Sequence, residues 1–122
     1  IISFYGAQER EIRKRLAPYI ERTDTALRLR IGTVDRFQGM ERPVVIVSMV
    51  CNNDRRSIGF AKEEERVNVA FSRAQELLII VGSLDMFCLN GPSGRPYQNV
   101  ASVVRKHNGI LSLPGDELLA MP

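Results

Sequence analysis

The stretch "PVVIVSMV", residues 43–50, decides the fold class because it is an apolar run without a charged residue. Such a run is typical of a central strand in a parallel sheet that is covered on both faces. A second run, "LLIIVGS" (77–83), predicts another fully buried strand. Between them, "KEEERVNVAFSRA" (62–74) has helical spacing, with its acids in the first turn. Strands that alternate with helices predict a three-layer α/β/α domain with a mainly parallel sheet.

The region before this run adds two strands and a helix. "IISFY" (1–5) is typical of the end of a buried strand, and "LRLRIGTV" (27–34) alternates like an edge or half-exposed strand. "AQEREIRKRLAPYI" (7–20) predicts a helix that Pro18 should end or kink near Ala17. The apolar face of this helix is expected to contain Ile12, Leu16, Tyr19 and Ile20.

The C-terminal region predicts one more helix, "YQNVASVVRKH" (97–107), after a loop at 90–96. Gly109 is expected to close this helix. "GILSLP" (109–114) is a candidate for a short last strand, and residues 109–122 are expected as a whole to form a loosely ordered tail. The expected apolar side of the helix contains Val100, Val103, Val104 and His107.

The composition fits a single globular domain. The chain has 122 residues, of which 44% are hydrophobic and 25% are charged. The net charge is +3, and 14 of the 17 basic residues are arginine. Because a guanidinium grips phosphate in a bidentate way, this bias favours a polyanionic partner. Arginine codon usage in a GC-rich genome explains it equally well.

Other classes of protein are not indicated. A single histidine leaves a zinc site short of ligands, so Cys51 and Cys88 are expected to be buried thiols of a cytosolic protein. No stretch approaches the ~20 consecutive apolar residues of a membrane span. We therefore expect a cytoplasmic protein, or a nuclear one if the source is a eukaryote. The Ile-Ile start, inside an expected strand, suggests a piece of a longer protein.

The linker "TVDRFQGMER" (33–42) is unusually rich in polar chemistry for a connection between two strands. It begins at the carboxyl end of a strand, where open α/β sheets bind their ligands. Farther along, Arg66 and Arg73 are seven residues apart and are expected to share one helix face. A solvated charged face paired with Glu63 or Glu76 is the alternative for these two arginines.

Three segments resemble motifs of the superfamily 1 helicases, and most closely those of the Upf-like branch. "IISFYGAQ" (1–8) resembles motif IV, "TVDRFQGMERPVVIVSMV" (33–50) motif V, and "ERVNVAFSRAQELLIIVG" (65–82) motif VI, with "IGF" (58–60) between the last two. The resemblance implies that residues 1–122 are the second RecA-like domain of a helicase motor. ATP and Mg²⁺ would then be held mainly by a missing first RecA-like domain, and single-stranded DNA or RNA would cross both domains, with 5′ to 3′ movement.

The resemblance also implies roles for residues at the nucleotide. Arg73 corresponds to the catalytic arginine that reaches the γ-phosphate, where a guanidinium can stabilise the charge of the transferring group. Gly39 would let backbone approach the phosphates, and Glu41 would accept hydrogen bonds from the ribose. Gln38 would lie between the nucleotide and the strand. Tyr5 and Gln8 would border the nucleotide site.

The remaining assignments concern the strand and one departure from the family. Thr33, Asp35 and Arg36 are expected to contact single-stranded nucleic acid. Glu9 stands where some family members have a basic residue. Arg10 is a candidate to reach the γ-phosphate instead, with a plain surface role as the alternative.

Two other functions remain open from the sequence. The chain contains no Gly-x-x-x-x-Gly-Lys-Ser/Thr loop, so the isolated fragment is expected to be inactive. "DELLA" (116–120) is expected to be a tail turn and no metal-binding motif. A degenerate, non-catalytic module that binds nucleic acid or protein is the first alternative. An unrelated nucleotide-binding enzyme with a complete site of its own is the second.

Overall fold

The computed structural model describes residues 1–21, 28–49, 55, 57–89 and 91–113. Its regular elements, in chain order, are β1 (Ile2–Ser3), α1 (Gly6–Ile20), β2 (Gly32–Thr33), the 3₁₀ helix η1 (Val34–Phe37), β3 (Arg42–Ser48), η2 (Gly59–Lys62), α2 (Glu64–Phe71), β4 (Ala74–Val81), α3 (Leu84–Cys88), η3 (Gly91–Gly94) and α4 (Arg95–Lys106).

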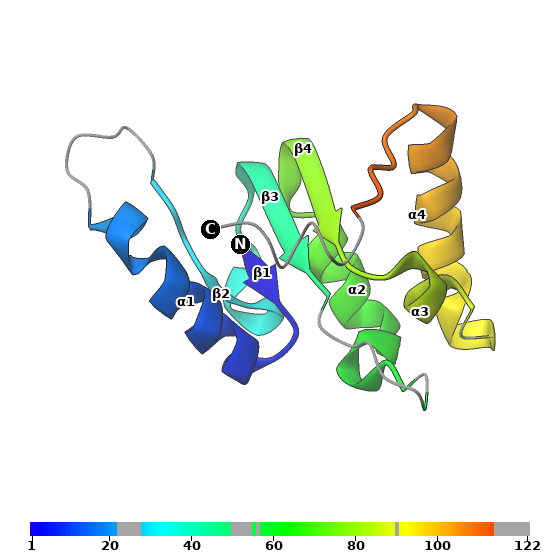
Figure 1. The fold of residues 1–122 in the computed structure, drawn as a ribbon, viewed down its shortest axis with the longest axis horizontal. Coiled ribbons are helices and arrows are strands. Elements are labelled where there is room, and N and C mark those ends of the chain that lie inside the picture. The colour runs from blue at the N-terminus through cyan, green and yellow to red at the C-terminus, as the bar shows by residue number, and fades with distance from the viewer. Residues whose placement is uncertain (22–27, 50–54, 56, 90, 114–122) are drawn as a thin grey trace.

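The four strands form one sheet in the order β2-β1-β3-β4, and every pair is parallel. β2 lies on one side of β1 and β4 on the other side of β3, so right-handed connections place α1 and α2 on opposite faces. Figure 1 shows α1 beside β2 at one end of the sheet, and α3 and α4 beyond β4 at the other. The predicted α/β fold with a parallel sheet is confirmed. The strand predicted over 27–34 does lie at the edge, but it is limited to Gly32–Thr33, and the described residues 28–31 form no strand.

The main core lies between the sheet and α2. Alternate residues of β3, Val45 and Val47, are buried there against Val67 and Ala70 of α2. Each large apolar side chain buried in this way stabilises the fold by about 1.5–3 kcal/mol. Phe37 of η1 belongs to the same core, so the polar linker is anchored by an aromatic ring.

The expectation that β3 and β4 are covered on both faces is wrong. β4 is an edge strand, and it begins at Ala74, before the predicted start. Residues that point away from α2 remain open on both strands. Their exposed fractions are 52% for Val44, 50% for Leu77, 39% for Ile79 and 54% for Val81.

The first helix also differs from its prediction. α1 continues to Ile20 with Pro18 inside it, because a proline in the last turn removes only one backbone donor. The next turn still closes, with the Glu21 N–H donating to the Ala17 carbonyl at 3.1 Å. Two members of the expected apolar face, Tyr19 and Ile20, are exposed in that last turn.

The segment predicted as one helix over residues 62–74 is divided into η2 and α2. α2 ends at Phe71, so Arg73 lies beyond the helix, in the short connection to β4. The prediction that Arg66 and Arg73 share a helix face is therefore wrong. Ser72 is the C-cap, and its N–H donates to the Asn68 carbonyl at 3.1 Å.

The C-terminal helix is confirmed as α4, but a short helix before it was missed. α3 begins after Ser83, whose hydroxyl accepts the Met86 N–H at 3.3 Å. On α4, Tyr97 and Ala101 are buried, while the expected core residues Val103 and His107 are exposed.

The end of the described chain closes α4 without forming a strand. Asn108 has a φ of 53°, and the Gly109 N–H donates to the Val104 carbonyl at 2.9 Å. Residues 109–113 form no strand. "DELLA" and Cys51 lie outside the described residues. Cys88 is only partly buried, and its burial raises the pKa of the thiol.

Candidate functional site

The linker at 33–41 carries the chain from the carboxyl end of β2 to the amino end of β3. Strand pairing puts Thr33 and Ser48 level with Ser3, at the carboxyl ends of the strands. Arg42, where β3 begins, is six residues before Ser48, which corresponds to about 20 Å along the strand. The residues expected to bind ligands are therefore divided between the two ends of the strands. We call the side of the sheet where the strands begin the amino edge, and the side where they end the carboxyl edge.

The amino edge brings together the end of the linker and the start of β4. The Arg42 N–H donates to the Arg73 carbonyl at 2.9 Å. Beside this bond, the Gln75 amide donates to Oε2 of Glu41 at 3.3 Å. These two contacts hold the motif V and motif VI segments in register, so Glu41 and Arg73 lie directly before the neighbouring strands β3 and β4 although they are far apart in sequence.

Arg73 has a partly buried side chain that is only partly satisfied. Its Nη2 donates to the Ser72 hydroxyl at 2.9 Å, and its Nη1 lies 3.5 Å from the Met40 carbonyl. Its Nε is buried without a hydrogen-bond partner. Within the described residues Arg73 makes no ion pair, so the alternative partner Glu76 is not engaged. An unmatched guanidinium at an edge is suited to an anionic ligand.

Gly39 lies next to this cluster in a conformation that favours glycine. Its φ is 77°, and a Cβ built there would meet nothing within 4 Å. The open space means that the backbone at Gly39 is accessible from outside. Gln38 is exposed, and its side chain makes no hydrogen bond with another described residue.

The carboxyl edge contains Tyr5 and Gln8, which were expected at the nucleotide together with Arg73. The Gln8 amide is held by two strands, because its Oε1 accepts the Ser3 hydroxyl at 2.6 Å and its Nε2 donates to the Ser48 hydroxyl at 2.7 Å. Gln8 is therefore near the level of Thr33 and about a strand length from Arg73. The structure separates Tyr5 and Gln8 from Arg73, and their expected place at the nucleotide stays a prediction.

Tyr5 contacts the "IGF" segment. Its hydroxyl accepts the Phe60 N–H at 3.1 Å, and the two rings are 5.5 Å apart. Gly59 has a φ of 52°, and a Cβ there would overlap the Tyr5 hydroxyl. The sequence identified "IGF" only by resemblance, and the structure gives it a physical role as the partner of Tyr5.

Two of the residues expected to contact the nucleic acid are held by ion pairs with two different helices. Asp35 is 3.4 Å from Arg66 of α2, and Arg36 is 3.3 Å from Glu9 of α1. Arg66 also pairs with Glu63 at 2.9 Å, as one alternative from the sequence proposed. η1 is therefore fixed between the two helices.

Arg10, the candidate for a second γ-phosphate contact, is exposed on α1 at the carboxyl side. Its side chain makes no hydrogen bond or ion pair with the described residues. Its position in the first turn of α1 puts it with Gln8 and away from Arg73. The structure thus favours the surface role for Arg10.

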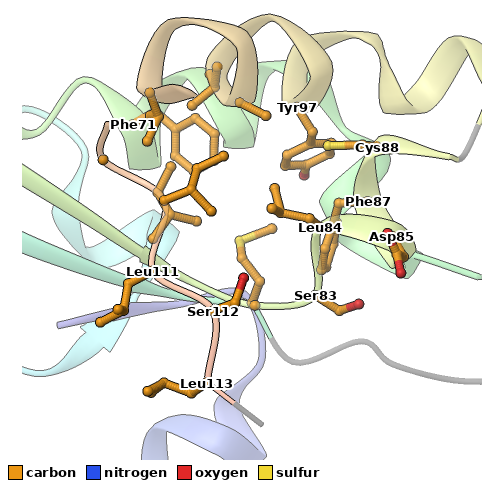
Figure 2. A pocket seen from close by; sticks show the side chains of 18 residues that line it. Phe71, Ser83, Leu84, Asp85, Phe87, Cys88, Tyr97, Leu111, Ser112 and Leu113 are labelled. Atoms are coloured by element: carbon orange, nitrogen blue, oxygen red, sulfur yellow. The ribbon is translucent and has the colours of Figure 1, made fainter. Parts of the chain in front are cut away.

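A cavity lies beside the C-terminal helices. Figure 2 shows it between the end of β4, α3, α4 and residues 109–113, with a volume of about 500 Å³. Its lining is mainly apolar and includes Phe71, Tyr97 and Cys88. None of the predicted site residues lines it, although its lining includes Met49 and Gly82, which directly follow β3 and β4 at the carboxyl ends of these strands.

Among the described residues, no group of three or more His, Cys, Asp or Glu side chains could hold a metal ion. In the same part of the chain, no helix has the length and apolar character needed to cross a membrane.

Comparison with known proteins shows which family this chain is similar to. Residues 1–85 match the family model described as "AAA domain". The chain is 40% identical over 86 residues to the DNA polymerase alpha-associated DNA helicase A of Saccharomyces cerevisiae, covering 70% of this chain and 12% of that protein.

Two further relatives have the same character. The helicase required for RNAi-mediated heterochromatin assembly 1 of Schizosaccharomyces pombe is 36% identical over 91 residues, 75% of this chain and 9% of the relative. The regulator of nonsense transcripts 1 homolog of Drosophila melanogaster is 46% identical over 55 residues, 45% of this chain and 5% of the relative. The chain thus spans a small part of each relative's length.

Proposed function

Because the chain belongs to the AAA domain family and is a superfamily 1 helicase domain, we propose that it is the second RecA-like half of an ATP-driven translocase on single-stranded nucleic acid. Its amino edge, with Gly39, Glu41 and Arg73, faces a nucleotide held by the first RecA-like domain of the full-length chain. The observation that carries this proposal is the buried Arg73 Nε, which has no hydrogen-bond partner among the described residues, beside Gly39 with its positive φ and open backbone.

The residues of the amino edge fit an ATP molecule. Arg73 supplies a planar cation for the γ-phosphate, where negative charge is redistributed as the phosphoryl group transfers. The open backbone at Gly39 allows close approach of phosphate oxygens. Glu41 is exposed and held by Gln75, so its carboxylate is positioned to accept hydrogen bonds from ribose hydroxyls.

Magnesium belongs to the first domain in this proposal. When bound with ATP, the ion neutralises charge on the phosphates. The described residues of this chain offer it no cluster of carboxylates, so the chain's own contribution is the guanidinium of Arg73 and the fit of the edge around the nucleotide.

The carboxyl edge contacts the nucleic acid. Thr33 and Arg36 lie where the linker leaves β2, and a hydroxyl and a guanidinium are suited to backbone phosphates. Tyr5 and Gln8 support this edge, because their polar groups bond to "IGF" and to β1 and β3. The linker at 33–41 joins the two edges, so a movement of the linker at the nucleotide can be transmitted to the bound nucleic acid.

The direct test is ATP hydrolysis by the full-length protein with single-stranded DNA or RNA added. We expect stimulation by strand, and no turnover above background by the 122-residue chain alone, because it lacks a phosphate loop. ATP hydrolysis by a contaminant-free 122-residue chain would contradict the half-site arrangement. Full-length protein that binds strand without hydrolysing ATP would favour the non-catalytic module.

The 122-residue chain should bind single strands weakly and in a salt-sensitive way. The net charge is only +3. In the proposed arrangement the first RecA-like domain supplies the other half of the surface that contacts the nucleic acid. Fluorescence anisotropy with a labelled oligonucleotide should give an affinity that falls by about tenfold or more between 50 and 200 mM salt if a few phosphates are contacted. Tight binding that persists in high salt would instead identify a dedicated binding module.

A further inference from the structure

The buried carboxylate of Glu9 connects α1 to the linker. Glu9 is only 7% exposed, and its Oε1 accepts hydrogen bonds from two arginines. Arg13, one turn later on α1, donates at 3.0 Å, and Arg36 of η1 donates at 3.3 Å. Charge-assisted hydrogen bonds to a buried carboxylate are strong, so this contact fixes η1 against α1.

A second contact from the same group fixes the other end of the connection. Arg13 also donates to the Ile31 carbonyl at 2.7 Å, directly before β2. Glu9 and Arg13 together therefore hold the chain on both sides of Gly32 and Thr33. A basic residue in place of Glu9 would face two guanidinium groups at this point, which explains why this chain has an acid there.

Among the residues that the structure describes, Arg36 is held only through one edge of its guanidinium. Its contact with Glu9 uses Nη1, and its side chain is 65% exposed. A guanidinium carries five N–H donors, so most of them remain available to solvent or to a ligand. An arginine that is anchored in this way loses less conformational freedom on binding an anion than a free one does.

We infer that Glu9 is a positioning residue that holds Arg36 in place for a phosphate of the nucleic-acid strand. The inference rests on the proposed function, because it assumes that the carboxyl edge contacts a strand. Glu9 itself faces away from solvent and contacts the strand only through Arg36. Removing its charge should therefore weaken strand binding without changing the chemical step at Arg73.

The test uses the full-length protein and measures ATP hydrolysis as a function of the concentration of a single-stranded oligonucleotide, as DNA and as RNA. For Glu9→Gln we expect the strand concentration at half-maximal rate to rise by about 5- to 10-fold, within the range of coupling between neighbouring charged groups. The rate at saturating strand should stay within about twofold. Glu11→Gln is the matched control, because Glu11 forms an exposed pair with Arg15 on the same helix at 2.7 Å.

A double variant distinguishes positioning from general stabilisation. Arg36→Ala should raise the half-maximal strand concentration by itself, and Glu9→Gln should add little to it, because its effect passes through Arg36. Equal effects of Glu9→Gln in the presence and absence of Arg36 would overturn the inference. So would an unchanged or lower half-maximal concentration for Glu9→Gln.

The same measurements separate this inference from the proposed function. If Arg36→Ala weakens strand binding but Glu9→Gln does not, the strand edge stands and the positioning role is refuted. If Arg36→Ala has no effect, both are refuted at this edge. If Glu9→Gln fails to fold, Glu9→Asp replaces it. The aspartate side chain is shorter by one methylene and does not reach Arg36, so we expect the same rise, with little further rise when Arg36→Ala is present. An unchanged half-maximal concentration for Glu9→Asp would overturn the inference.

Discussion

Replacing Arg73 by alanine in the full-length protein should slow strand-stimulated ATP hydrolysis by about 10³-fold or more. The guanidinium is partly buried, and its Nε has no partner among the described residues, so its hydrogen bonding is incomplete until an anion arrives. Its charge matters most in the transition state, where negative charge is redistributed over the phosphoryl oxygens. Lysine should rescue poorly because it is a point charge without a planar fork.

Controls decide between catalysis and stability. Arg105 is exposed on α4 and belongs to neither group of candidate site residues, so Arg105→Ala should leave turnover within a few fold of the unaltered protein. Strand binding without nucleotide should survive in Arg73→Ala, because the residue lies at the opposite edge from Thr33. Near-normal turnover at saturating ATP and strand would refute the assignment. A collapsed melting curve would show that Arg73 holds the fold instead.

The sequence predicted those parts of the fold that depend on local pattern. The apolar run at 43–50 identified the central strand, and the alternation of strands and helices identified the parallel sheet. The sequence-based prediction failed where the burial of a strand depends on which other strands lie beside it. Leu77, Ile79 and Val81 have the composition of a buried strand, but they lie on an edge strand, and edge position is a property of the strand order and not of the run.

The same limit applies to the candidate site. The family resemblance brought Glu41 and Arg73 into one hypothesis, and the structure places them directly before the neighbouring strands β3 and β4. It could not show that Gln8 belongs to the other edge, because that depends on the register of β1 with β3. The role of Glu9 was also invisible, since its partner Arg36 is 27 residues away.

A second large effect is expected in the core, at Phe37. This side chain is 2% exposed and is the largest of the fully buried ones, although it stands in a polar linker. A Cβ at Gly32 would come within 3.0 Å of its ring, so the ring fills its space closely. Phe37→Ala should reduce the free energy of unfolding by about 3–5 kcal/mol. For a domain this is a large part of a total stability of about 5–15 kcal/mol.

Urea denaturation of the 122-residue chain measures this loss, and Phe60→Ala is the matched control. Phe60 is 49% exposed and contacts Tyr5 and Arg66 by its ring, so its removal should cost about 1–1.5 kcal/mol. Equal losses for the two variants would contradict the burial of η1. Because Phe37 anchors the linker two residues before Gly39, its loss should also free the Met40 carbonyl from Arg73. In the full-length protein Phe37→Ala is therefore expected to impair ATP hydrolysis even at temperatures where the domain remains folded, whereas Phe60→Ala leaves the amino edge intact.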